Sequence, residues 1–324
     1  MHRHTAITFE TQFEEEVYQG LTDFPKHLSS KYFYDKKGDA LFQRIMDMPE
    51  YYLTDAELSI FEDYTTQITD LFKREKGHFN LIELGAGDGK KTKVLLRHLA
   101  ENNSNFTYQP IDISQNVLNG LSDSLSEEIP EIAVQTKQGT YFEALSELNA
   151  TNASRKVILF LGSNIGNLLH EQAVTFLKNV QELMQVGDLF LVGFDQKKNP
   201  QTILDAYNDA TGITAAFNKN VLARINSELG GDFDLDQFLH WEVYDPETGT
   251  AKSYLVSQKQ QTVHIEALGV QVKFEPWETI HTEISQKYDD RIVSWLAEQS
   301  GLQIETEFTD SKKLYKNYVF RKNA

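Results

Sequence analysis

A glycine-rich stretch in the first half of the chain combines residue types that suit the binding of a nucleoside. The stretch reads ELGAGDG at residues 83–89 and lies between an apolar run and a helical pattern. Glycines allow the backbone to approach a ligand closely, and the N-terminus of the following helix offers free N–H groups to an anion. Asp112, at the end of the next predicted strand, is placed to accept hydrogen bonds from both hydroxyls of a ribose.

The spacing of these glycines separates two kinds of cofactor. Nicotinamide dinucleotides are bound by G-x-G-x-x-G, whereas this chain has G-x-G-x-G with Glu83 two residues before the first glycine. The observed form favours S-adenosylmethionine, whose carboxylate takes backbone amides while its ammonium seeks acidic or carbonyl groups. Asp112 suits both cofactors. A glycine-rich turn in an α/β protein that binds no nucleotide is the third interpretation.

The elements around this stretch alternate between strand and helix. Short apolar runs predict strands at 80–85, 108–113, 133–138, 156–162 and 189–195, and helical patterns follow at 91–99, 115–125 and 171–184. Such alternation is typical of a parallel sheet with right-handed crossovers. Two further strands, at 302–308 and 315–321, look antiparallel. The order is compatible with the α/β, Rossmann-like seven-stranded methyltransferase fold.

The remaining segments have another character. The first sixty residues look helical and carry an aromatic cluster, and residues 203–228 also read as helical. Strand-like stretches at 238–244, 253–257 and 270–274 follow, separated by turn residues, and a helix is expected at 290–298. No linker of low complexity separates these parts, so we expect any second domain to be inserted into the first.

Composition excludes several classes of function. The chain has 31 Lys and Arg against 48 Asp and Glu, a net charge of −17, and no cysteine. An acidic surface repels nucleic acid and anionic membranes, and the absence of thiols excludes disulfides, iron–sulfur clusters and Cys-type zinc sites. The sequence contains no HExxH motif and no clustered acidic triad, so it predicts no metal site. It also has no run of about 18 apolar residues, so it predicts no membrane span. We therefore expect a cytoplasmic protein, for which a cationic or zwitterionic small molecule stays possible as a partner.

Five segments together resemble the histidine Nα-methyltransferases of ergothioneine biosynthesis. They occur in the family's order and read KYFYDKKGDALFQRIMDMPEYYLTDAE (31–57), LIELGAGDGKKT (81–92), LFLGSNIGN (159–167), AYNDATGITAAFNKNVLARIN (206–226) and TEIS (282–285). The resemblance implies an enzyme that transfers methyl groups from S-adenosylmethionine to the α-amine of L-histidine, three times, giving hercynine. It also implies a cofactor domain at 60–196 plus 287–324 and an inserted α+β substrate domain at 1–59 plus 197–286.

The same resemblance assigns substrate roles to individual residues. Asn167 and Tyr207 are expected to hold the amino-acid group, since an amide and a phenol can orient a carboxylate. Glu283 and Ser285, which share one face if the segment is a strand, are expected to bind the imidazole together with Tyr51. Tyr34 is expected beside the amine as a catalytic proton relay, with water an equal candidate. Without the resemblance, ordinary packing or solvation is the better explanation of each of these residues.

The cofactor site is expected to comprise eight residues. For Tyr141 and Phe142, stacking on the adenine base and packing in the core are both open. The predicted cofactor-binding residues are Glu83, Gly85, Gly87, Gly89, Lys91, Asp112, Tyr141 and Phe142.

Other interpretations stay open at this point. Relatives carry a methionine near the position of Ser253, and relatives that methylate tryptophan lose the glutamate that this chain keeps as Glu283. Tryptophan or another aromatic amino acid is therefore the second candidate substrate, after histidine. An NAD-dependent oxidoreductase and a non-catalytic S-adenosylmethionine-binding protein are the alternatives from other classes. The oligomeric state is left open.

Overall fold

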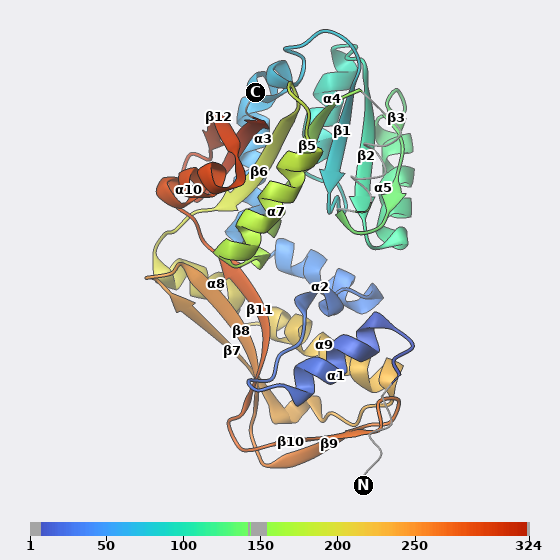
Figure 1. The fold of residues 1–324 in the computed structure, drawn as a ribbon, viewed down its shortest axis with the longest axis vertical. Helices are drawn as coiled ribbons and strands as arrows, with labels where there is room; N and C mark the ends of the chain where they lie inside the picture. Colours follow the sequence, from blue (N-terminus) through green and yellow to red (C-terminus); the bar gives the residue numbers. More distant parts are fainter. Residues whose placement is uncertain (1–7, 142, 144–153, 323–324) are drawn as a thin grey trace. The chain divides into compact units, whose positions relative to one another are not determined.

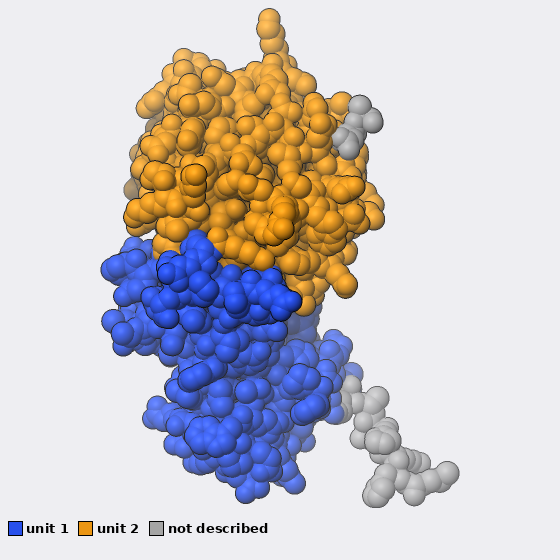
Figure 2. Space-filling model, turned by 90° about the vertical axis from the view of Figure 1, so that its left-hand side faces the viewer, with its two compact units in different colours: residues 1–51, 198–285 blue, residues 52–197, 286–324 orange. Residues whose placement is uncertain are grey.

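The chain divides into two compact units, shown in different colours in Figure 2. The computed structural model describes residues 8–141, 143 and 154–322. The larger unit comprises Tyr52–Lys197 and Gln286–Ala324, and the smaller unit comprises Met1–Tyr51 and Lys198–Ser285. The chain therefore passes from one unit to the other three times, after Tyr51, Lys197 and Ser285.

The larger unit is built on one mixed sheet (Figure 1). The strand order is β12-β13-β6-β5-β1-β2-β3, with β4 also paired to β2. The pairs β12–β13 and β13–β6 are antiparallel, and the other pairs are parallel. This topology confirms the predicted Rossmann-like methyltransferase fold. Where one strand was predicted at 133–138, two short strands, β3 and β4, each pair with β2. The strands are β1 (Phe79–Leu84), β2 (Phe106–Asp112), β3 (Ala133–Val134), β4 (Lys137–Gln138), β5 (Arg155–Phe160), β6 (Leu189–Asp195), β12 (Leu302–Thr309) and β13 (Tyr315–Lys322).

Helices cover this sheet and close its core. Helix α7 places Ala173, Phe176, Leu177 and Val180 on one face, as helical spacing requires, and that face packs on the strands together with α10. Helices α3 and α4 pack on each other, and α3 contacts β6 and β13. The described helices of this unit are α3 (Tyr52–Phe72), α4 (Thr92–Glu101), α5 (Gln115–Glu128), η2 (Asn164–Asn167), α7 (His170–Leu183) and α10 (Asp290–Ser300).

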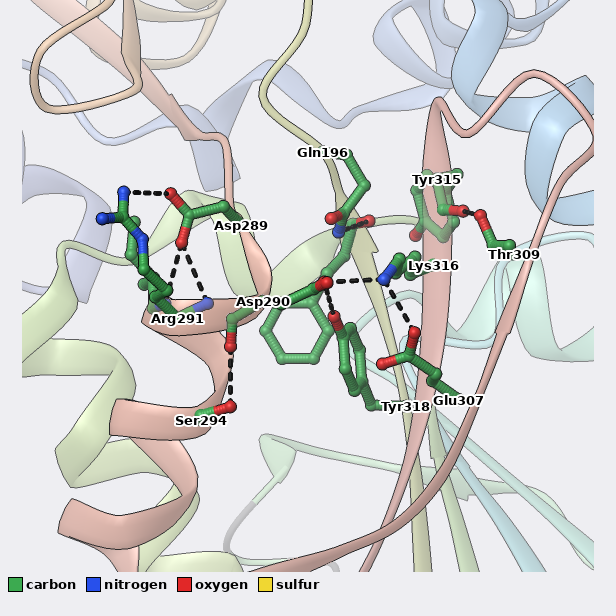
Figure 3. A network of polar contacts seen from close by, with 12 residues as sticks. Gln196, Asp289, Asp290, Arg291, Ser294, Glu307, Thr309, Tyr315, Lys316 and Tyr318 are labelled. Carbon is green, nitrogen blue, oxygen red and sulfur yellow. Dashed lines mark hydrogen bonds and ion pairs between the residues drawn. The ribbon is translucent and has the colours of Figure 1, made fainter.

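A polar network fastens the start of α10 to the terminal hairpin (Figure 3). Asp289 caps the helix by accepting from the backbone N–H groups of residues 291 and 292. The carboxylate of Asp290 accepts from the Tyr318 hydroxyl and from Lys316 Nζ at 2.6 Å, and the same ammonium lies 2.7 Å from Glu307. These hydrogen bonds hold the pKa of Asp290 below its usual value. The helix that follows the insertion is thereby tied to β12 and β13.

The smaller unit combines helices with a three-stranded sheet of order β11-β8-β7 and a hairpin of β9 and β10. The stretch predicted as helical at 203–228 forms two helices, because the Asp209 carboxylate accepts from the N–H groups of Ile213 and Thr214 and starts α9 anew. Strand β9 was not predicted. The described elements are α1 (Gln12–Thr22), η1 (Ser30–Phe33), α2 (Lys36–Met46), α8 (Pro200–Tyr207), α9 (Ile213–Leu229), η3 (Leu235–Gln237), β7 (Phe238–Asp245), β8 (Thr250–Ser257), β9 (Gln261–Ile265), β10 (Val270–Phe274) and β11 (Thr279–Gln286).

The smaller unit has a core of its own. Phe217, Val221 and Ile225 on α9 pack with Leu255 on β8 and Ile280 on β11. Residues alternate between buried and more exposed along β7, as expected for a sheet with one face on a core. Over the described ranges 8–141, 143 and 154–322, no helix is long and apolar enough to cross a membrane. The cytoplasmic location stays a prediction.

Candidate active site

The glycine loop, residues 85–91, joins β1 to α4 in the larger unit. Gly85, Gly87 and Gly89 have φ of +72°, +56° and +66°, values that favour glycine. A Cβ on Gly85 would lie 2.9 Å from the Tyr141 hydroxyl, so this position needs glycine for space as well as conformation. A Cβ on Gly87 would meet nothing within 4 Å, so its backbone borders open space. The loop is thus a turn whose backbone can be approached by a ligand.

Asp112 lies at the end of β2, beside this loop. One carboxylate oxygen accepts from the Gly87 N–H at 3.3 Å, and the other accepts from the Ser114 N–H at 3.0 Å. The parallel pairing of Leu84 with Ile111 brings the two strand ends together. The structure therefore unites Gly87 and Asp112, which the sequence predicted as parts of one site.

Glu83 is buried, and its carboxylate has partners within the protein. It accepts from the Thr92 hydroxyl at 2.7 Å and from the Tyr108 hydroxyl. Burial raises the pKa of Glu83 to about 7, against the lowering effect of these two hydrogen bonds. Through them Glu83 joins β1 to β2 and to the first turn of α4, which flank the glycine loop.

Lys91 ends the glycine loop and forms an ion pair with Glu57. The ammonium lies 2.5 Å from Glu57 Oε2, and this carboxylate, fully buried, also accepts from the Gly162 N–H and the Asn317 side-chain amide, each at 2.8 Å. Glu57 was not predicted as a site residue. The signal for it is a charged residue beside Ala56, Ile60 and Phe61 on the buried face of a helix. Glu57 thus links the glycine loop to the segments after β5 and in β13.

Tyr141 packs against the core of the larger unit. Its ring meets Phe160 edge-on at 5.5 Å and Phe176 at 6.4 Å between centroids. Burial and the charge of Asp112 raise the pKa of Tyr141 to about 12. The packing interpretation therefore describes its ring, while its hydroxyl borders Gly85. Phe142 lies outside the described residues.

Asn167 ends the short helix η2 in the turn after β5. The turn begins at Ser163, whose φ of +58° lies in the left-handed region. A Cβ on Gly166 would lie 3.0 Å from the carbonyl oxygen of Gln286, so the turn packs closely on that segment. Asn167 itself is exposed. The backbone of the turn is fixed while its last side chain is presented at the surface.

In the smaller unit, the Tyr207 hydroxyl is hydrogen-bonded to Ser285 Oγ at 2.7 Å. Both residues are buried, at the end of α8 and in β11. Nε2 of His240 is hydrogen-bonded to the Tyr207 carbonyl at 3.0 Å, and burial lowers the pKa of this histidine. Neither contact is visible in the sequence, because α8, β7 and β11 meet only in the fold.

Aromatic rings connect this pair to the N-terminal segment. The ring of Tyr51 meets Tyr207 at 6.3 Å and Phe42 at 6.4 Å, and Phe42 meets Tyr34 at 5.6 Å, all edge-on. Tyr34 is 39% exposed. The structure thus brings four predicted site residues into one series of contacts, which we call the hydroxyl cluster: Tyr34, Tyr51, Tyr207 and Ser285, bridged by Phe42.

Glu283 is half-buried on β11, two residues before Ser285. Beside it, the Thr282 hydroxyl donates to the carbonyl of Ser253 at 3.0 Å. The hydroxyl of Ser253 donates to Glu242 Oε2 at 2.7 Å, and both of these residues are buried. The polar residue that stands at position 253 is therefore engaged by a carboxylate of the neighbouring strand, which the sequence did not predict.

A family model described as "Histidine-specific methyltransferase, SAM-dependent" matches residues 13–322. The chain belongs to this family. It is 36% identical to the histidine N-alpha-methyltransferase of Mycolicibacterium smegmatis, over 91% of this chain and 90% of the relative. Identity to the enzyme of the same name from Mycobacterium tuberculosis is 34%, with the same coverage. An L-tryptophan methyltransferase of Psilocybe serbica is 29% identical over 92% of this chain and 90% of the relative.

The methyltransferase uses S-adenosylmethionine, as the description of its family states. The family and the cofactor are thus as predicted, and the NAD-dependent alternative is wrong. The larger unit fits this cofactor, because the backbone at Gly87 borders open space and Asp112 stands beside it. Within the described ranges, no group of three or more His, Cys, Asp or Glu residues could hold a metal ion.

Proposed function

We propose that this methyltransferase transfers methyl groups to the α-amine of L-histidine, three in succession, and so produces hercynine for ergothioneine biosynthesis. The observation that carries the proposal is the buried hydrogen bond between Tyr207 and Ser285, two residues from Glu283, in a chain whose bacterial relatives are histidine N-alpha-methyltransferases. A site built to bind a polar side chain rejects analogues that lack its hydrogen-bonding groups.

The larger unit holds the cofactor in this proposal. The turn at Gly87, whose backbone borders open space, receives S-adenosylmethionine, and Asp112 accepts from the ribose hydroxyls. Asp112 accepts from two N–H groups in the structure, and a carboxylate has about four lone-pair sites, so two acceptor positions remain. When bound, the cofactor supplies an electrophilic methyl group on a sulfonium. Lys91 and Tyr141 complete the site, with Lys91 held by Glu57.

The smaller unit supplies most of the groups that orient the substrate. Tyr207 binds the carboxylate of histidine, and Glu283 and Ser285 bind the imidazole with Tyr51. Asn167 is the further residue proposed to hold the amino-acid group. A hydroxyl has one proton and two lone pairs, so Tyr207 and Ser285 can keep their mutual hydrogen bond while each takes a further partner. The pair therefore couples recognition of the carboxylate to recognition of the imidazole.

Methyl transfer requires a neutral amine. An α-amino group has a pKa near 8 in peptides, so a proton must leave before the nitrogen lone pair can attack. Tyr34 is the residue proposed beside the amine, and its partly exposed hydroxyl can pass this proton to water. The chain contributes mainly by positioning, since alignment of two reactants in a site replaces much of the entropic cost of their encounter.

The test is a methyl-transfer assay with purified protein, S-adenosylmethionine and one of three acceptors: L-histidine, L-tryptophan or imidazole propionate, which lacks the amine. We expect methylated products from histidine alone, up to the trimethyl form by mass spectrometry. Glu283→Ala should raise the KM for histidine roughly tenfold through loss of a hydrogen bond to a charged group, whereas Glu266→Ala, exposed in the same unit, should not. Turnover of tryptophan in place of histidine would overturn the assignment of histidine as the substrate. No turnover of any acceptor would overturn the proposal that the protein catalyses this reaction.

Two further properties belong to this proposal. The net charge of −17 disfavours nucleic acid and anionic membranes as partners. The larger unit is proposed to be the cofactor domain and the smaller unit the substrate domain, because the glycine loop lies in the first and the hydroxyl cluster lies in the second.

A further inference from the structure

A buried ion pair in the larger unit lies outside all the predicted site residues. Lys287 Nζ is 2.8 Å from Asp195 Oδ2, and both side chains are fully buried. The Tyr52 hydroxyl donates to the same carboxylate, at 2.8 Å from Oδ2 and 3.0 Å from Oδ1. The three residues come from the start of α3, the end of β6 and the segment after β11.

Such a pair is poorly explained as a source of stability. Removing both charges from water costs about as much as their attraction returns, so a buried ion pair adds little net stability. Breaking the pair by removing one partner is nevertheless costly, because one charge is left buried without compensation. The pair therefore restricts the geometry of the segments that carry it more than it strengthens the fold.

The network stands where the chain passes between the two units. Tyr52 follows the first passage directly, Asp195 lies two residues before the second, and Lys287 lies two residues after the third. Backbone hydrogen bonds join the last two segments, from the Tyr288 N–H to the Asp195 carbonyl at 2.8 Å and from the Lys197 N–H to the Tyr288 carbonyl at 2.7 Å. All three passages are thus tied together inside the larger unit.

The same segments hold the turn that presents Asn167. The Asp195 N–H donates to Ser163 Oγ at 3.2 Å, at the start of that turn. The Tyr288 hydroxyl donates to the carbonyl of Ile165 at 3.0 Å. The backbone of Asn167 is thereby linked to the segment that carries Lys287.

We propose that Tyr52, Asp195 and Lys287 are positioning residues for the amino-acid substrate. Each is close in sequence or by hydrogen bond to a residue of the proposed substrate site: Tyr52 adjoins Tyr51, Lys287 follows Ser285 by two residues, and Asp195 holds the turn of Asn167. The network fixes the backbone from which these side chains reach the substrate, and it does so without touching the substrate. This inference rests on the proposed function.

The test measures histidine affinity and cofactor affinity separately, by calorimetric titration of the purified protein. Lys287→Met keeps the length of the side chain and removes its charge, and Tyr52→Phe removes one hydroxyl. Small displacements of positioned groups cost up to about 100-fold, so we expect histidine to bind Lys287→Met roughly 10- to 100-fold more weakly in the presence of S-adenosylhomocysteine. For Tyr52→Phe, the loss of one hydrogen bond predicts a decrease of about three- to tenfold. Binding of S-adenosylhomocysteine should stay at the wild-type level in both variants.

Lys156 provides a matched control in the same unit. It pairs with Asp188 at 3.0 Å and is similarly buried. This pair lies at the start of β5 and β6, whereas Asp195 lies at the end of β6. Lys156→Met should lower the melting temperature while histidine affinity is retained. A similar loss of histidine affinity in Lys156→Met and Lys287→Met would overturn the inference, because general destabilisation would then explain both.

The remaining outcomes separate this inference from the proposed function. Wild-type histidine affinity in Tyr52→Phe and in a folded Lys287→Met would overturn the positioning role and leave the proposed function intact. If Lys287→Met does not fold, Tyr52→Phe decides alone, since it leaves the ion pair in place. A wild-type protein that binds no histidine would overturn the proposed function and this inference together.

Discussion

The glycine loop of the larger unit and the hydroxyl cluster of the smaller unit are constructed in different ways. In the loop the backbone is the proposed binding surface, and Gly85 and Gly87 adopt positive φ within one turn between β1 and α4. In the hydroxyl cluster the proposed binding groups are side chains, and Tyr207 and Ser285 are 78 residues apart in the sequence. The loop therefore depends on its own few residues, whereas the cluster depends on the packing of the whole smaller unit.

The two regions also differ in the charge of the side chains around them. Buried carboxylates, Glu83 and Glu57, flank the glycine loop and are satisfied by hydroxyls, an amide and Lys91. Neutral hydroxyls and rings make up the hydroxyl cluster. We therefore expect the region around the glycine loop to respond to pH and to backbone changes, and the hydroxyl cluster to respond to the loss of single hydroxyls.

The largest expected effect concerns pH and Glu83. Because the folded-state pKa of about 7 lies above the ordinary value of 4.5, the folded protein holds more protons than the unfolded chain between these values. Stability contributed by the protonated carboxyl is present below that window and is lost as the pH rises through it. In Glu83→Gln this dependence should disappear, so the variant should gain up to about 3 kcal/mol relative to wild type between pH ~5 and pH ~8.

Denaturant unfolding at the two pH values measures this gain. Glu128→Gln is the control, because Glu128 is held at a pKa of about 2 by hydrogen bonds from Lys93 and Ser124 and does not titrate in the window. An equal difference from wild type at both pH values in Glu83→Gln would contradict the prediction.

An intermediate effect is expected from Gly85→Ala. The substitution places a Cβ at positive φ and within 2.9 Å of the Tyr141 hydroxyl, and such strain costs about 1–3 kcal/mol. Affinity for S-adenosylhomocysteine should fall roughly 5- to 150-fold by calorimetry. Gly120→Ala, in the exposed part of α5 with nothing near its Cβ, should bind the ligand as wild type does. Unchanged affinity in Gly85→Ala would show that the loop backbone does not form the cofactor site.

The smallest effect is expected in the hydroxyl cluster. Tyr207→Phe and Ser285→Ala each remove one side of the 2.7 Å hydrogen bond, and each should weaken histidine binding about five- to tenfold with cofactor affinity unchanged. The double variant should lose about 1 kcal/mol less than the sum, because the two hydroxyls are coupled.

Ser257→Ala serves as the control for this cycle, since Ser257 is a buried serine of β8 that donates to the Lys259 carbonyl. It should leave histidine affinity unchanged. If the losses of binding free energy in the two single variants add up to the loss in the double variant, Tyr207 and Ser285 act independently. That result would contradict the proposed coupling of carboxylate and imidazole recognition.

The alternating α/β fold, its antiparallel end and the glycine loop could be predicted from the sequence alone. These features follow from local rules, since apolar periodicity specifies strands and helices and a glycine at positive φ is a property of its own residue. Asp112 could be added because parallel strands end at the same edge of a sheet. The substrate was inferred from the resemblance of five segments to one family, because apolar periodicity and glycine spacing carry no information about the substrate.

The tertiary structure alone decided which distant side chains meet. Glu57 with Lys91, Asp195 with Lys287, and Ser253 with Glu242 are pairs that no spacing in the sequence indicates. Each forms because packing buries a polar group, and a buried polar group costs free energy unless another segment supplies its partner. The physical reason is that hydrogen-bond satisfaction in the interior is a condition on the whole fold, whereas turn conformation and periodicity are conditions on a few neighbouring residues.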